Sequence, residues 1–510
     1  MKEPYDWRKR IAFWLRKKRN ELGLTQGGLA AKCKQIANGT PGCEATGLTS
    51  ISRYETGRHK DLPSPERVMC WAKALQVTPD YFWNDVDVDE QRKADAEMRK
   101  RERAALADPE LYGFLENYYK EENIKLLKPW GMTYPLVGWR VPEAKQAVWR
   151  SLLEFDGPFR LPQYSREEFA FYDANIVEKR KTEKRDMVNN PTFCLRHFDA
   201  DRPCVVGGLV GKYFDALATC DALEKELLHA WATKRRGKGF DQVSVALHYR
   251  NKLRDYCKAR QVSPITSGVG RSAAIAIATL TVYRVKDGPV NKFQAFFAPR
   301  SGIVANHPHM LHVAPSGMFQ PTCDWNLPWE ADECREEWNV AHHVYRELVE
   351  EIFDYTDEEL HGMTGKKLYG LPEVRHIKGF LEPDGTSEKG AELLTTGIIV
   401  NLLNLRLEIC TLLLIHDPRW YARHASADGV RAFKLNREFA TKEELDTLEA
   451  GGLPRLLRLT VWNRGRFLSE GEIIEQIGDV SPAMIVAPGA AALWYGLEAA
   501  ERRLAGLGHA

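Results

Sequence analysis

Residues 8–83 carry a succession of short helical patterns separated by turn residues, and this feature constrains the fold more than any other. The first helix would place four apolar side chains on one face, those of Ile11, Trp14, Leu15 and Leu22. The turn GLTQ, residues 23–26, follows, and Thr25 is a suitable N-cap for a second helix that holds Leu29 and Ala30. The sequence therefore predicts a small all-α domain in this part of the chain.

A third helix is predicted within LTSISRYETGR, residues 48–58, and its two faces differ. Ile51 and Tyr54 would face the core, and Gly57 suits the end of the helix. The outer face would hold Leu48, Thr49, Ser52 and Arg53. A helix that presents small polar side chains and an arginine can enter the major groove of DNA and meet the edges of the bases.

Charge is distributed unevenly along the chain. The net charge of +2 over 510 residues would by itself argue against a nucleic-acid binder. Residues 1–83, however, contain 15 Lys and Arg against 8 Asp and Glu, a local net charge of +7, which leaves −5 for the rest. Such an asymmetry is typical of a chain that meets nucleic acid at one end. A helical bundle that mediates protein contacts is the alternative.

The segments LRKKRNELGLTQ, ISRYETGR and PSPERVMCWAKALQVTPDYF occur in this order between residues 8 and 83. In this they resemble the Cro/C1-type (XRE-family) helix-turn-helix domain. The resemblance implies that residues 1–84 bind double-stranded DNA, as a homodimer on a pseudo-palindromic operator. Gln26 would bond a phosphate at the start of the second helix. The other phosphate contacts would come from Lys17, Lys18, Arg58 and Lys60.

One segment departs from the resemblance. About eleven extra residues, within KQIANGTPGCEAT from Lys34 to Thr46, separate the second helix from the third, and their Gly, Pro and Asn content predicts a loop. Either the second helix is longer than usual, or the loop itself contacts DNA.

The rest of the chain predicts a multidomain protein. Residues 85–105 would form a charged linker, 106–265 a mixed α/β middle domain, and 266–510 a further α/β domain. Strands are predicted at 192–199, 205–214, 273–285, 293–298 and 394–415, with a hairpin turn at Asp287-Gly288, and helices at 217–232, 339–353 and 490–504. Strict alternation of apolar and polar residues from Leu403 to Ile409 predicts a half-buried strand.

The predicted helix at 339–353 contains the sequence RELVEE, residues 346–351. Glu347, Glu350 and Glu351 stand at positions i, i+3 and i+4, so they would share one helical face. Carboxylates gathered in this way repel one another unless a divalent cation or an arginine lies between them. The face is therefore a candidate site for Mg²⁺ or Mn²⁺ with a diphosphate. A solvated, salt-bridged helix face is the alternative.

This helix and the strands before it resemble the Nudix domain, over roughly residues 267–500. That domain is an α/β/α sandwich with the box G-x5-E-x7-R-E-U-x-E-E-x-G-U. The resemblance implies that Glu350 and Glu351 match metal ligands and that Glu347 matches a ligand or the catalytic base. Arg346 would then match the arginine that orients the glutamates.

The box is degenerate. Trp338 stands where the first glutamate belongs, Asp332 replaces the opening glycine, Phe353 the late glycine and Asp354 the final apolar residue. The nearest preceding glycine, Gly317, lies 29 residues before Arg346. Missing glycines remove the tight loop that lets the backbone approach metal and phosphate. We therefore expect ligand sensing or a structural role in preference to hydrolysis.

Two further observations bear on location. The ten cysteines include no C-x-x-C pair and no zinc-ligand spacing, which predicts reduced thiols in a cytoplasmic protein. The longest apolar run, residues 397–415, is interrupted by Asn401, Asn404, Arg406 and Glu408, which argues against a membrane span.

Three functions are compatible with these patterns. The favoured one is a cytoplasmic, nucleoid-associated transcription regulator whose Nudix-like part senses a nucleotide-like ligand or mediates assembly. The second is an Mg²⁺-dependent Nudix-type hydrolase of a nucleoside diphosphate derivative, with an appended DNA-binding domain. The third is a non-enzymatic assembly protein that uses both domains for protein contacts.

Overall fold

A computed structural model divides the chain into two compact units. It describes residues 7–56, 59, 63–77, 79, 100–146, 153–154, 166–177, 189–200, 205–234, 240–287, 290–300, 310–321, 337–360, 363, 365–378, 380–381, 387–388, 390–426, 431–434, 436, 439 and 458–505. The first unit contains the described residues up to Lys100, and the second contains those from Arg101 onward.

Several predicted features lie outside the described residues: Gly57, Arg58, Lys60, Tyr81, Phe82, Gly288, Asp332 and residues 85–99 of the predicted linker. The described end of that linker, residues 100–105, is helical.

The described part of the first unit contains the helices α1 (Trp7–Glu21), α2 (Gln26–Gly39), α3 (Leu48–Glu55) and α4 (Pro65–Leu75). Apolar side chains from all four form one core, in which Leu15, Leu29, Ile51, Tyr54 and Trp71 are at most 1% exposed. The predicted cap is confirmed, because the Thr25 hydroxyl accepts a hydrogen bond from the amide of Gly28 at 2.9 Å.

Two expectations for this unit need correction. Leu22 is 36% exposed instead of buried, because α1 ends at Glu21 and Gly23 turns the chain away with a φ of +64°. The predicted loop from Lys34 to Thr46 is shorter than expected, because α2 continues to Gly39. Only residues 40–47 connect α2 to α3.

The connecting loop, residues 40–47, is fixed to α4. The Glu44 carboxylate accepts a hydrogen bond from the Ser64 hydroxyl at 2.7 Å and forms an ion pair with Arg67. The indole of Trp71 donates to the Thr46 hydroxyl at 3.0 Å. The loop is therefore part of the folded unit and directs the chain into α3.

The second unit is built on a mixed sheet, to which the described strands contribute in the order β1-β11-β12-β5-β6-β13-β14. Their bounds are β1 Leu136–Arg140, β11 Ala391–Asn401, β12 Arg406–Ile415, β5 Ala276–Asp287, β6 Val290–Pro299, β13 Arg458–Asn463 and β14 Arg466–Phe467. Two short strands, β7 (Leu311–Val313) and β8 (Ser316–Met318), pair with β6 and β5. The predicted hairpin is confirmed, because β5 and β6 are antiparallel up to the pair Asp287 and Val290. β12 and β5 are parallel.

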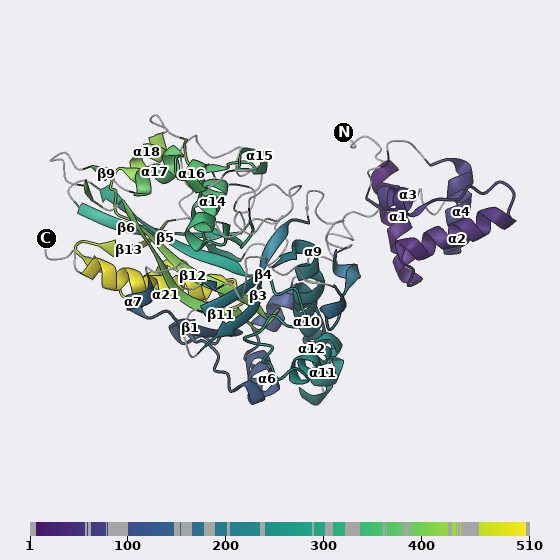
Figure 1. The fold of residues 1–510 in the computed structure, drawn as a ribbon, viewed down its shortest axis with the longest axis horizontal. Helices are drawn as coiled ribbons and strands as arrows, with labels where there is room; N and C mark the ends of the chain where they lie inside the picture. The colour runs from purple at the N-terminus through teal and green to yellow at the C-terminus, as the bar shows by residue number, and fades with distance from the viewer. Residues whose placement is uncertain are drawn as a thin grey trace. The chain divides into compact units, whose positions relative to one another are not determined.

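Helices cover both faces of this sheet (Figure 1). The described helices are α6 Pro109–Tyr118, α7 Glu143–Gln146, α9 Tyr213–Ala216, α10 Ala222–Lys234, α11 Phe240–Ala246, α12 His248–Lys258, α14 Val340–Phe353, α15 Asp357–Leu360, α16 Gly365–Leu368, α17 Pro372–Lys378, α18 Trp420–Ser426, α20 Glu470–Ile477 and α21 Ala487–Ala505. α21 packs on one face, whereas α14, α16, α17 and α18 pack on the other (Figure 1).

Strand β12 divides its side chains between two cores. Leu412 and Leu414 pack toward α21, and Leu413 and Ile415 pack toward α14 and α18. Every residue of β12 is buried. The predicted half-buried strand from Leu403 to Ile409 is therefore wrong: residues 402–405 form the turn after β11, and the strand that follows is buried on both faces.

The described residues between 106 and 265 share the second unit with the described residues from 266 onward. Strand β1 pairs with β11 at the edge of the large sheet. The predicted strands near 192 and 205 are confirmed as β3 (Pro191–Asp199) and β4 (Val205–Lys212), which with β2 (Leu153–Glu154) form a sheet in the order β2-β4-β3. The amides of Phe193 and Leu195 in β3 donate to the carbonyls of Phe319 and Ala273, each at 2.8 Å. The middle segment therefore packs as part of a larger core.

Among the described helices, none combines the length and the apolar character needed to cross a membrane.

Candidate functional site

Helix α3 carries the side chains that the sequence predicts to meet DNA. Leu48 is 53% exposed at the start of the helix. Thr49 and Arg53 are exposed, and Ser52 is half-buried. Ile51 and Tyr54, on the opposite side, lie in the core. The helix is thus anchored by one face, and its other face can contact a partner without disturbing the core.

The C-terminal end of α3 is fixed by a buried carboxylate. Glu55 is 1% exposed, and its carboxylate accepts hydrogen bonds from Arg19 Nε at 2.6 Å, Arg19 Nη2 at 3.0 Å and Gln26 Nε2 at 2.8 Å. Arg16 donates to the backbone carbonyl of Glu55, and Arg19 Nη1 donates to that of Leu24 at 2.6 Å. These contacts join α1, the turn before α2, the start of α2 and the end of α3.

Sequence reasoning missed the role of Glu55, although a signal was present. Ile51, Tyr54 and Glu55 stand at i, i+3 and i+4, so an acidic residue falls on the face that the apolar residues identify as buried. A buried carboxylate requires a cationic partner. Its partner, Arg19, lies 36 residues away, and the sequence pattern does not connect the two.

The predicted phosphate contacts are distributed over the first two helices. Gln26 begins α2, as expected, and its amide nitrogen is bonded to Glu55. Lys17 is exposed on α1, and its ammonium lies 4.8 Å from the centre of the Trp14 ring. Lys18 is half-buried.

Helix α14 confirms the predicted helix at 339–353 and carries the three carboxylates. Asn339 caps it by accepting a hydrogen bond from the amide of His342 at 3.1 Å. Glu347 and Glu351 are 8% and 2% exposed, whereas Glu350 is half-buried. The helix is therefore enclosed on most of its surface and does not present a solvated acidic face.

The two buried carboxylates contact strand β8. Glu351 accepts a hydrogen bond from the amide of Ser316 at 3.0 Å. Glu347 lies so close to Gly317 that a Cβ atom on that glycine would be 2.7 Å from Cδ of Glu347. A residue with a Cβ at this position would force the Glu347 carboxylate to shift. Glu347 also forms an ion pair with Arg346 and lies 3.6 Å from Nδ1 of His343.

His343 is held in a neutral state within this cluster. Burial lowers its pKa well below the usual value, and the nearby charges of Arg346 and His342 act in the same direction. A hydrogen bond with the backbone of Gly317 opposes these effects without reversing them.

Trp338 fills the space at the start of α14. It is 5% exposed and stacks on Phe319, with ring centres 5.1 Å apart, and it meets Phe193 edge-on at 4.8 Å. A Cβ on Gly208 would lie 2.9 Å from Cζ3 of Trp338. Tight aromatic packing thus occupies the position where the sequence resemblance would require a glutamate.

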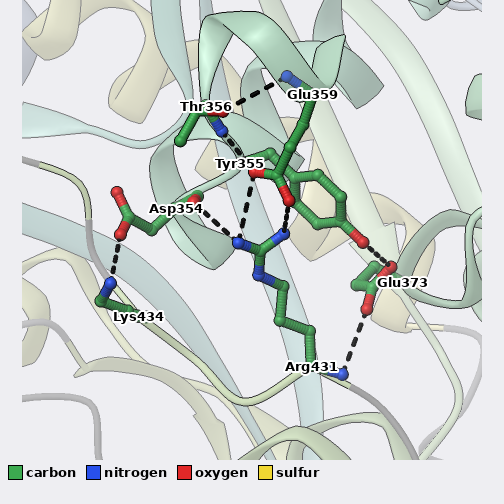
Figure 2. A network of polar contacts seen from close by, with 7 residues as sticks. All are labelled: Asp354, Tyr355, Thr356, Glu359, Glu373, Arg431 and Lys434. Atoms are coloured by element: carbon green, nitrogen blue, oxygen red, sulfur yellow. Dashed lines mark hydrogen bonds and ion pairs between the residues drawn. The ribbon is translucent and has the colours of Figure 1, made fainter.

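The C-terminal end of α14 is held by a polar network (Figure 2). Asp354 ends the helix in a left-handed conformation with a φ of +51°, a position that favours glycine. Lys434 pairs with the Asp354 carboxylate at 2.5 Å, and the Arg431 guanidinium donates to the Asp354 carbonyl at 3.1 Å. These contacts stabilise a helix ending at which a glycine is the usual residue.

Arg431 connects this ending to the neighbouring helices (Figure 2). Its guanidinium pairs with Glu359 at 3.0 Å and lies 3.9 Å from the centre of the Tyr355 ring. The Arg431 amide and the Tyr355 hydroxyl donate to the two carboxylate oxygens of Glu373, at 3.2 and 3.0 Å. The network fixes the orientation of α14 and so the positions of its carboxylates.

The carboxylates predicted as Mg²⁺ or Mn²⁺ ligands, Glu347, Glu350 and Glu351, do not form a cluster of ligands in the structure. Among the residues that it describes, no group of three or more His, Cys, Asp or Glu side chains is arranged to hold a metal ion. Glu347 and Glu351 contact β8, while Glu350 remains at a half-exposed position.

No model of a known protein family and no curated protein matches the chain. The function is therefore inferred from the geometry of α3 and α14.

Proposed function

We propose that this protein is a sequence-specific, DNA-binding transcription regulator in which α1–α4 form a Cro/C1-type helix-turn-helix domain. The observation that carries the proposal is the two-sided character of α3. One side is embedded in the core through Ile51 and Tyr54, and the other presents Thr49 and Arg53 to the exterior. In the proposed complex α3 lies in the major groove, where Arg53 and Thr49 reach base edges.

The charge around α3 supports the same proposal. Residues 1–83 carry a net charge of +7. Lys17 and Lys18 on α1 would supply phosphate contacts, whose strength depends on salt. The side-chain nitrogen of Gln26 is bonded to Glu55. At the start of α2, Gln26 would therefore contribute to phosphate binding through its position and through the backbone amides of the first helical turn. Gln26 thus supports DNA binding both directly and by holding α3.

The second unit would act as the sensing or assembly part of the regulator. We infer a Nudix-like sandwich that binds a nucleotide-like ligand or mediates formation of a homodimer. Binding is favoured over hydrolysis because Glu351 is bonded to the Ser316 amide and Glu347 lies against Gly317. These two side chains would have to break their contacts with β8 before they could act on a substrate. In this proposal the protein is cytoplasmic and associated with the nucleoid.

The direct test is selection of bound sequences from random double-stranded DNA by the full-length protein, followed by gel-shift titration. We expect an enriched pseudo-palindromic sequence. Arg53→Ala should weaken binding by about 5- to 150-fold, since a good base contact contributes roughly 1–3 kcal/mol. Gln26→Ala should also weaken it. Lys73→Ala on α4, an exposed residue, is the matched control that removes one positive charge elsewhere.

Two results would contradict the proposal. One is the absence of any enriched sequence, which would favour a protein-contact function. The other is equal affinity of the Arg53→Ala, Gln26→Ala and control variants. Hydrolysis is tested separately, with Mg²⁺ and a panel of nucleoside diphosphate derivatives. Turnover by the wild type that is lost in Glu351→Gln would overturn the non-catalytic assignment of the second unit.

A further inference from the structure

Three cysteines from three separate elements meet in the core of the first unit. Cys33 lies on α2, Cys70 on α4, and Cys43 in the loop of residues 40–47. The Cys70 thiol donates a hydrogen bond to the carbonyl of Cys33 at 3.3 Å. Cys33 and Cys70 are completely buried, and Cys43 is half-buried against the same core.

The thiol of Cys70 interacts with both of the other cysteines. Burial raises its pKa, and its side chain interacts by hydrogen bonding with both Cys33 and Cys43. Burial also raises the pKa of Cys33, with Cys70 and Cys43 as additional causes. The two buried thiols are therefore protonated at neutral pH. Because Cys43 is half-buried and the other two are completely buried, Cys43 is the member of the cluster that a dissolved oxidant can reach first.

The loop holds Cys43 in place beside α4. Its neighbour Glu44 is bonded to Ser64 and Arg67, and the amide of Cys43 donates to the carbonyl of Thr40 at 3.3 Å. The Glu44 amide also donates to the carbonyl of Glu66 on α4 at 3.2 Å, so the loop beside Cys43 lies against the turn of α4 that precedes Cys70. Gly47, at the end of the same loop, is the N-cap of α3.

We propose that Cys43 and Cys70 are an oxidant-responsive modification site, which a peroxide converts to an intramolecular disulfide. The Cys43 thiolate attacks the peroxide, so that an S–O bond forms, the O–O bond breaks, and water or an alcohol leaves after protonation. The Cys70 sulfur then attacks the sulfenic acid, so that the S–S bond forms and the S–O bond breaks. The hydroxyl leaves as water with the proton of Cys70. Two thiols are oxidised and one peroxide is reduced.

The disulfide would tie the loop that precedes α3 to α4 by a covalent bond. Such a cross-link restricts the unfolded chain and stiffens the connection to α3. We expect the oxidised first unit to unfold at a temperature about 5–15 °C higher than the reduced one. Amide exchange in residues 40–47 should slow in parallel. This inference does not depend on the proposed DNA binding.

The test uses the full-length protein treated with hydrogen peroxide and then with a thiol-blocking reagent. Peptide mapping without reduction should show a Cys43–Cys70 cross-link that dithiothreitol reverses. Cys43→Ser should abolish it, and Cys33→Ala should retain it. As the control, the same protein is oxidised in urea, where Cys43 should no longer be cross-linked preferentially to Cys70.

Each alternative result would overturn the proposal. These are a Cys33–Cys70 link, a link between two chains, or oxidation of Cys43 to a sulfinic acid with Cys70 still reduced. Unchanged exchange in residues 40–47 of the cross-linked protein would overturn the stiffening of the loop.

Discussion

The ion pair between Arg19 and Glu55 allows a sharp test of how the first unit is held together. Replacing Arg19 by Met retains the length and apolar stem of the side chain and removes its charge. Among the described residues, Gln26 would then be the one remaining side chain that donates a hydrogen bond, at 2.8 Å, to Glu55, which is 1% exposed. Removing one partner of a buried ion pair typically costs about 3–5 kcal/mol, because the remaining charge is uncompensated.

That cost is large for a unit of this size. At about 0.05–0.15 kcal/mol per residue, a unit of roughly 70 residues has a free energy of unfolding of about 4–11 kcal/mol. Arg19→Met should therefore remove about a third or more of it. Hydrogen exchange of the full-length protein, followed by mass spectrometry, should show protection of the slowest α1–α4 amides reduced by about 100- to 5,000-fold.

The amides of the second unit provide an internal control, and Arg53→Met provides a matched variant. Arg53 is an exposed cation on the same helix as Glu55, so its loss should change stability by less than about 0.5 kcal/mol. The double variant Arg19→Met, Glu55→Leu should recover much of the loss, because neither charge remains buried. Equal protection in Arg19→Met and Arg53→Met would refute the role assigned to the ion pair.

Two further predictions concern the second unit. Because the pKa of His343 is lowered in the folded state, its contribution to stability is fully present above the unfolded pKa of about 6.5 and is lost as the pH falls below it. The unfolding temperature of this unit should therefore fall between pH 7 and pH 5. In His343→Gln the unfolding temperature should fall less steeply with pH, and an equal dependence on pH in both proteins would contradict the lowered pKa of His343. Gly317→Ala should destabilise the unit by about 1–3 kcal/mol in urea unfolding, since the added Cβ meets Glu347. The control is Gly113→Ala on α6, where an added Cβ meets nothing within 4 Å; it should stabilise the unit by about 0.5–1 kcal/mol. An equal loss of stability in the two variants would argue against the close contact between Gly317 and Glu347.

Local patterns predicted the elements whose signals lie within a few turns of chain. The apolar spacing of Val340, Val344, Leu348 and Ile352 identified α14, and the Asp287-Gly288 turn between two β-branched runs identified the β5–β6 hairpin. The last helix and the cap at Thr25 were predicted for the same reason. In each case the residues that determine the structure are close in sequence.

Features that depend on distant partners were not predicted. The alternation from Leu403 to Ile409 suggested a solvent-facing side because it contains Arg406 and Glu408. Arg406 is nevertheless 8% exposed, since it forms an ion pair with Asp221, 185 residues away. The three carboxylates of α14 were expected on one open face, but β8 covers two of them. A pattern along one element indicates which residues share a face, and only the tertiary fold determines what covers it.

The parallel pairing of β5 with β12 has a consequence for synthesis of the protein. Ala276 pairs with Glu408, so the central contact of the large sheet joins segments about 130 residues apart, and α21 closes one face only from Ala487. At about 5–20 residues per second, a ribosome needs roughly 10–45 s to pass from β5 to the end of α21. During this interval the apolar face of the β5–β6 hairpin lacks its final cover. The contacts of α1–α4 lie within residues 7–77, so the first unit can fold long before the second is complete.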